Sequence, residues 1–154
     1  MKKNEKVTEV LNDLIRINHD RVEGYERAAK ETRAEDTDLR TLFTEMANES
    51  RNYASELSRC VISHGENPAE GATAPGKIYR AWMDVKAAFT GKDRKAILSS
   101  CEFGEDAAQR AYDAALASEA EMPTDIRQMI VDEKNKLRQS HDKIKSMRDS
   151  ERER

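Results

Sequence analysis

The chain has 154 residues and a formal net charge of −3, and charged residues make up 37% of it while aromatic residues make up 5%. This length suits one domain, here residues 1–154, that buries a core without disulfide bonds. The few glycines and prolines exclude a sandwich or a barrel, because those folds need many turns, and favour an all-α protein. Acidic and basic residues are interspersed along the chain. The sequence therefore has no basic stripe of the kind that indicates nucleic-acid binding.

The sequence also lacks the signals of a membrane or secreted protein. No apolar run approaches the roughly 20 residues of a membrane span. The basic start of the chain, Met1–Lys6, is not followed by an apolar segment, so we expect no secretory signal. Cys60 and Cys101 lie far apart without metal-type spacing, which is typical of two reduced cysteines. We therefore predict a cytoplasmic protein.

Four long segments repeat apolar residues at helical spacing. The first predicted helix covers about residues 4–32. The second, about residues 37–64, begins after Asp36, a residue type that caps helix N-termini, and stops before Gly65. The third covers about residues 93–118, and the fourth follows Pro123 and covers about residues 124–149. All four are amphipathic and long enough to form a helical bundle.

The connections predict how these helices are arranged. Short links join the first helix to the second and the third to the fourth, which favours two antiparallel hairpins. The segment 65–92 is too long for a hairpin loop. It begins with loop residues and then has a helical pattern over about residues 77–89, centred on Trp82. One long crossover that carries a short helix between two hairpins is the ferritin-like four-helix bundle.

Several segments resemble a family of bacterial ferritin-like four-helix-bundle proteins of unknown function. They are Val10–Ile15, Glu23–Glu26, Arg80–Lys86, Glu102–Ala108, Tyr112–Leu116 and His141–Ile144. The Trp-Met-Asp-Val-Lys sequence in the third of these, followed by Gly-Glu-Asp in the fourth, is the most specific part. The resemblance covers nearly the whole chain. It implies the fold and says little about activity, although it suggests a role in bacterial stress.

The centre of the predicted bundle lacks most ligands of a di-iron site. Such sites take one Glu from each of two helices and a Glu-x-x-His pair from each of the other two. Here Ser50 and Tyr53 stand at spacing three where Glu and His are needed, and Asn18 occupies the inward position of the first helix. Glu105 is the inward residue most like a ligand. We predict a buried polar layer of Asn18, Ser50, Tyr53 and Glu105, in which Glu105 is hydrogen-bonded, or protonated with a raised pKa.

The remaining candidate ligands are few. Glu133 flanks the apolar stripe of the fourth helix, and His141 lies on that stripe. A single histidine there is more often a hydrogen-bonded core residue than a metal ligand. His19 is expected at the rim of the core, and His64 at the end of the second helix, where it can serve the last carbonyls. As metal ligands, Glu105, Glu133 and His141 are therefore only weak candidates.

The sequence has no phosphate-binding loop, catalytic triad or nucleophile motif. We expect a protein that is not an enzyme, needs no cofactor and acts by association with protein, either as a homodimer or with another partner. The crossover helix with Trp82 is one candidate contact surface. The alternative is an iron-binding protein or iron-dependent oxidoreductase that uses Glu105, Glu133 and His141. A small-ligand pocket in the polar layer is a third hypothesis.

Overall fold

The computed structural model describes residues 2–71, 94–118 and 120–151, and these ranges contain four helices and no strand. The helices are α1 (Lys2–Glu31), α2 (Thr37–Ser63), α4 (Arg94–Ala117) and α5 (Thr124–Ser150). The prediction of an all-α protein is confirmed, and each helix ends within two residues of its expected bounds. The predicted short helix over residues 77–89, with Trp82, lies outside the described residues. None of the described helices is long and apolar enough to cross a membrane.

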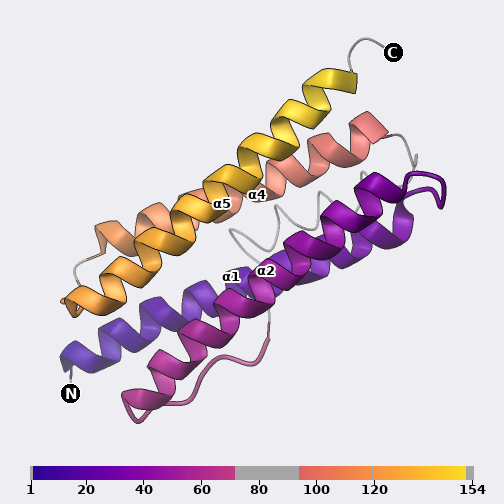
Figure 1. The fold of residues 1–154 in the computed structure, drawn as a ribbon. Coiled ribbons are helices and arrows are strands. Elements are labelled where there is room, and N and C mark those ends of the chain that lie inside the picture. The colour runs from indigo at the N-terminus through magenta and orange to yellow at the C-terminus, as the bar shows by residue number, and fades with distance from the viewer. Residues whose placement is uncertain (1, 72–93, 119, 152–154) are drawn as a thin grey trace.

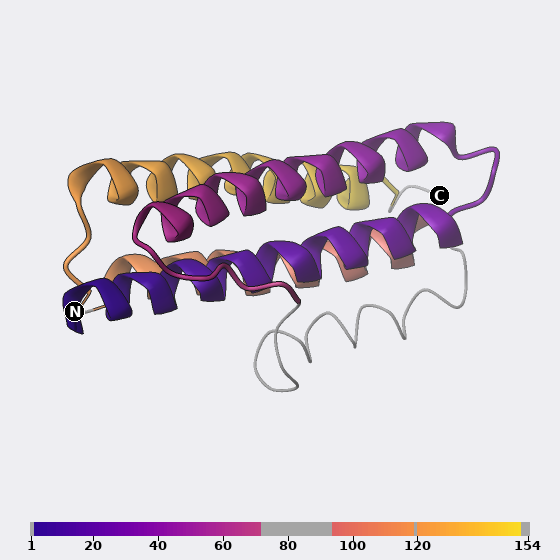
Figure 2. The same cartoon turned by 90° about the horizontal axis from the view of Figure 1, so that it is seen from below.

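The four helices lie side by side along one long axis. Figure 1 shows that α1 and α2 run in opposite directions, and so do α4 and α5. The pair α1 and α2 and the pair α4 and α5 pack most extensively, and α1 also packs against α4. Seen from below in Figure 2, α1 and α4 form one layer and α2 and α5 form the other. Because α2 and α5 barely touch, the bundle is packed less closely on that side than on the other three.

The core consists of two apolar clusters with polar residues between them. One cluster lies toward the turn between α1 and α2 and includes Phe43, Leu98 and Ile144. The other lies toward the start of α1 and includes Leu11, Leu57 and Ile130. Cys101 is fully buried in the first cluster and its burial raises the pKa of the thiol, whereas Cys60 packs at the edge of the second. Between the clusters every helix contributes at least one buried polar residue.

Backbone hydrogen bonds close the C-terminal end of α2, and its N-terminal end has no side-chain cap. At its C-terminus the N–H of Gly65 donates to the carbonyl of Ile62 at 2.9 Å, and the N–H of Glu66 donates to that of Val61 at 3.2 Å. Gly65 has φ +77°, the left-handed conformation that this Schellman ending requires. At the N-terminus Asp36 makes no side-chain cap hydrogen bond. Its carboxylate instead pairs with Arg94 at the start of α4, at 3.1 Å.

Candidate functional site

A fully buried arginine, Arg21 of α1, lies at the centre of the bundle. Its Nε donates to Oε1 of Glu105 at 2.5 Å, and its Nη2 donates to Oε2 at 3.1 Å. Arg21 is 0% exposed and Glu105 is 1% exposed. Burial by itself would lower the pKa of Arg21, but the charge and hydrogen bonds of Glu105, together with Tyr25 and Glu49, outweigh it and hold that pKa above its ordinary value. Glu105 is therefore hydrogen-bonded to a cation that the sequence analysis did not identify.

The rest of the guanidinium binds α2. Nη1 of Arg21 donates to Oγ of Ser50 at 2.8 Å and to the carbonyl of Met46 at 3.2 Å, and it lies 2.9 Å from Oε1 of Glu49. Ser140 of α5 donates its hydroxyl to the same carboxylate of Glu49 at 3.1 Å. The planar guanidinium offers five donors in fixed directions, so one side chain can bind several acceptors at once. Arg21 in this way links α1 to α2 and α4, and through Glu49 to α5.

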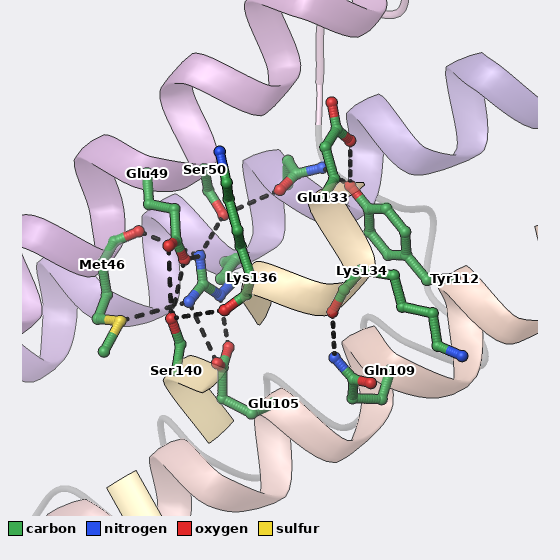
Figure 3. Close-up of polar contacts among 12 residues, drawn as sticks. Met46, Glu49, Ser50, Glu105, Gln109, Tyr112, Glu133, Lys134, Lys136 and Ser140 are labelled. Carbon is green, nitrogen blue, oxygen red and sulfur yellow. Dashed lines mark hydrogen bonds and ion pairs between the residues drawn. The ribbon is translucent and has the colours of Figure 1, made fainter. Parts of the chain in front are cut away.

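A chain of hydrogen bonds continues from Ser50 to α5 (Figure 3). Oγ of Ser50 donates to Oδ1 of Asn18 at 2.9 Å, and Nδ2 of Asn18 donates to the hydroxyl of Tyr112 at 2.9 Å. That hydroxyl donates in turn to Oε1 of Glu133 at 2.7 Å. Each hydroxyl accepts one hydrogen bond and donates one, so the donors all point the same way from Arg21 to Glu133. The network crosses all four described helices.

Glu133 ends this chain without a counter-charge. Its side chain is 2% exposed, and its Oε2 accepts no hydrogen bond and has the carboxylate of Glu56 beside it. Burial raises the pKa of Glu133 to about 9, and the neighbouring carboxylate of Glu56 contributes to the rise. At neutral pH Glu133 is therefore mainly protonated and neutral. Burial and Glu133 likewise raise the pKa of Tyr112, which keeps its hydroxyl as a donor.

Two adjoining hollows open beside Glu133, where α2 and α5 barely touch. The first has a volume of about 400 Å³ and the second about 760 Å³, and Tyr53, Glu56 and Lys136 line both. We call them together the α2–α5 cleft. Its ionisable residues are mostly acidic. The carboxyl groups are Glu45, Glu49, Glu56, Asp125, Asp132 and Glu133, and the basic side chains are Arg59 and Lys136.

The structure distributes the predicted site residues over three places. Asn18, Ser50 and Glu105 belong to the Arg21 network, and Tyr53 is buried but lines the cleft. The three weak metal candidates do not meet. Glu105 binds Arg21 and Glu133 binds Tyr112, while His141 lies 2.7 Å from Asp106 and 3.9 Å from Glu102.

Arg21 is the residue that the sequence analysis missed. Leu14, Asn18, Arg21 and Tyr25 are spaced four, three and four apart, which is the spacing of a core stripe. Val22, four residues after Asn18, fits helical spacing as well and is apolar, but it is only half-buried, whereas Arg21 is fully buried. The spacing could have identified Arg21, but the ordinary preference of arginine for the surface argued against it.

The residues at the centre do not fit a di-iron site. Such a site needs inward carboxylates and imidazoles whose oxygen and nitrogen atoms are directed at the metal ions. Here both oxygens of Glu105 accept hydrogen bonds from Arg21, and Asn18 and Ser50 are bonded to their neighbours. The guanidinium supplies the positive charge that metal ions would bring. A metal at this position would have to displace a buried cation.

Residues 6–118 match the family described as Domain of unknown function (DUF2383). The match contains Arg21, Glu105, Asn18, Ser50 and Tyr112, and ends before α5, which supplies Glu133 and His141. No curated protein matches the chain.

Proposed function

The chain belongs to the DUF2383 family, and we propose that it is a non-enzymatic bundle of ferritin-like architecture that acts by binding another protein. The observation that carries the non-enzymatic part is the bidentate ion pair of Arg21 and Glu105 at the bundle centre. In this ion pair both oxygens of Glu105, the inward residue most like a metal ligand, accept hydrogen bonds from Arg21. The antiparallel pairing of α1 with α2 and of α4 with α5 supports the ferritin-like classification.

The α2–α5 cleft is the surface that we propose for the partner. Glu56 and Asp132 face this cleft from opposite helices, and carboxylates outnumber basic side chains along its walls. An acidic groove favours a partner segment that carries lysine or arginine, through electrostatic complementarity. A partner helix could place its basic side chains along such a groove. We therefore propose a basic segment of another protein as the occupant.

Site-specific photocrosslinking in cells tests this proposal. A benzoylphenylalanine crosslinker would replace Asn52, which is exposed and lines the cleft, or Arg110, which is exposed on α4. We expect one discrete adduct from position 52 and none from position 110. The double variant Glu56→Lys/Asp132→Lys should abolish the adduct, because it reverses two charges of the cleft. Equal adducts from both positions, or an adduct that the double variant leaves unchanged, would contradict the proposal.

The non-enzymatic part is tested separately with iron and dioxygen. Fe(II) would be added under air to the purified full chain and to the variant Glu105→Gln, and dioxygen consumption would be followed. We expect no consumption beyond that of free iron in either sample. Multiple turnovers by the wild type that are lost in Glu105→Gln would overturn the proposal and establish the iron-dependent oxidoreductase.

A further inference from the structure

Three potential metal ligands meet between α4 and α5, away from the Arg21 network. Glu102 and Asp106 stand one turn apart on α4, and His141 faces them from α5. Nε2 of His141 lies 2.7 Å from Oδ1 of Asp106 and 3.9 Å from Oε1 of Glu102. All three ligand atoms lie within 4.8 Å of one another, and no other such group occurs among the described residues.

The histidine is oriented as a ligand would be. Its Nδ1 lies 3.1 Å from Oδ1 of Asp142. Metal-binding histidines commonly donate their second ring nitrogen to a carboxylate in this way, which fixes the tautomer and the direction of the ring. Nε2 is buried and makes no hydrogen bond of acceptable geometry, although Asp106 is close. At Nε2 the protein therefore offers only the close contact with Asp106 and the more distant Glu102.

The distances suit a small divalent ion. Ligand atoms about 2.0–2.2 Å from a metal are roughly 3.0–3.5 Å from one another in octahedral or tetrahedral geometry. The two separations from Nε2, 2.7 and 3.9 Å, lie on either side of this range. Asp106 is 45% exposed, so a rotation of its side chain could lengthen the shorter separation into this range, whereas the longer one would need a small shift of Glu102 or His141.

The local charge also favours a cation. Arg148 binds the other oxygen of Glu102 and pairs with Asp149, which leaves Oε1 of Glu102 directed toward His141. With a neutral imidazole, Glu102, Asp106 and Asp142 outweigh the single charge of Arg148. A divalent ion would offset this excess.

We propose that Glu102, Asp106 and His141 bind one divalent transition-metal ion, of which Zn²⁺ is the representative. One imidazole with two carboxylates is typical of Zn²⁺, Mn²⁺ and Fe²⁺, whereas Ca²⁺ and Mg²⁺ prefer oxygen ligands alone. Three protein ligands leave positions for water. The site joins α4 to α5 and does not depend on the proposed partner.

Zn²⁺ titration of the metal-free full chain, in competition with a chromophoric chelator, tests the proposal. We expect one ion per chain. His141→Ala and Asp106→Asn should each raise the Kd at least tenfold, and Asp142→Asn should raise it less because it acts through the histidine. The matched control is His19→Ala on α1, which should leave the Kd unchanged.

Co²⁺ substitution supplies a second readout that does not rely on affinity. The visible d–d bands of bound Co²⁺ should change in Asp106→Asn while the helical circular dichroism stays the same. A Zn²⁺ affinity that His141→Ala leaves unchanged, or that His19→Ala lowers equally, would overturn the proposal. So would Co²⁺ bands that are the same in wild type and Asp106→Asn.

Discussion

Glu105 and Glu133 are both almost fully buried, but the surroundings of their carboxyl groups differ. Glu105 has both oxygens bonded to Arg21. Glu133 accepts one hydrogen bond from Tyr112, has its second oxygen beside the carboxylate of Glu56 and not beside a cation, and has a pKa raised to about 9. Equal burial therefore leads to two chemical states. The partner of a buried carboxyl group, more than its depth, decides whether it is an ion-pair member or a neutral acid.

The largest loss of stability should follow from removing Arg21, the cation that pairs with Glu105. Arg21→Met leaves Glu105 buried without its counter-charge, and we expect a loss of about 3–5 kcal/mol in the free energy of unfolding. Urea denaturation measured by circular dichroism checks this. The double variant Arg21→Met/Glu105→Leu should recover much of the loss, because it removes the stranded charge. A double variant no more stable than the single one would show that packing, and not the ion pair, accounts for the loss.

The carboxyl group of Glu133 should make the stability of the protein depend on pH. The pKa of Glu133 is about 9 in the folded protein and about 4.5 as the reference value for the unfolded chain. The folded state therefore binds more protons between these values, and the contribution of Glu133 is complete below pH about 4.5 and declines as pH rises toward 9. The slope is at most about 1.4 kcal/mol per pH unit.

Urea unfolding of the wild type and Glu133→Gln at pH 5, 6, 7 and 8 isolates this contribution. Gln cannot ionise, so the free energy of unfolding of Glu133→Gln, relative to that of the wild type, should increase with pH. Glu56→Gln removes a neighbouring carboxylate that raises the pKa of Glu133, so in this variant the decline in stability should end at a lower pH than in the wild type. A constant difference between wild type and Glu133→Gln at all four pH values would mean that Glu133 does not titrate in this range.

Removing the Tyr112 hydroxyl, which joins Asn18 to Glu133, should have an intermediate effect on stability. Tyr112→Phe removes both the acceptor for Asn18 and the donor to Glu133. We expect a loss of about 1–3 kcal/mol, because buried polar groups lose their partners. Tyr53→Phe is the matched control, since Tyr53 lines the cleft, and should cost less. Thermal melts of both variants make the comparison, and equal losses would argue against a special role for the Tyr112 hydroxyl.

The smallest effect should come from ion pairs near the surface. Arg94 is 20% exposed and pairs with Asp36 and Asp38, and its hydrogen bonds lower the pKa of Asp38. Arg94→Ala should cost no more than about 1 kcal/mol. In about 1 M salt, where the Debye length is roughly 3 Å, most of this difference should disappear. A salt-independent loss would instead indicate that the aliphatic part of Arg94 contributes by packing.

The helices were predictable because amphipathic spacing and helix-end residues are local signals. Residue identity and spacing likewise place Asn18, Ser50 and Glu105 on inward faces. Arg21 was missed although its spacing was equally good, because a guanidinium is normally kept at the surface and only a partner on another helix makes its burial favourable. That partner, Glu105, is 84 residues away in the sequence.

The α2–α5 cleft could not be predicted for a related reason. The cleft depends on how far apart α2 and α5 lie, and the apolar spacing within a single helix carries no information about that distance. The same holds for the group of Glu102, Asp106 and His141. The spacing of Glu102 and Asp106 is visible in the sequence, but the identity of the residue facing them on α5 depends on the register between the two helices.

The burial of Cys101 gives the protein an internal probe of its own opening. A thiol with no exposed surface and a raised pKa is protected from alkylating reagents while the helices stay packed. Modification then requires transient separation of α4 from its neighbours, and its rate under native conditions reports the population of that open state. Cys60, which is only partly buried, provides a faster reference within the same molecule.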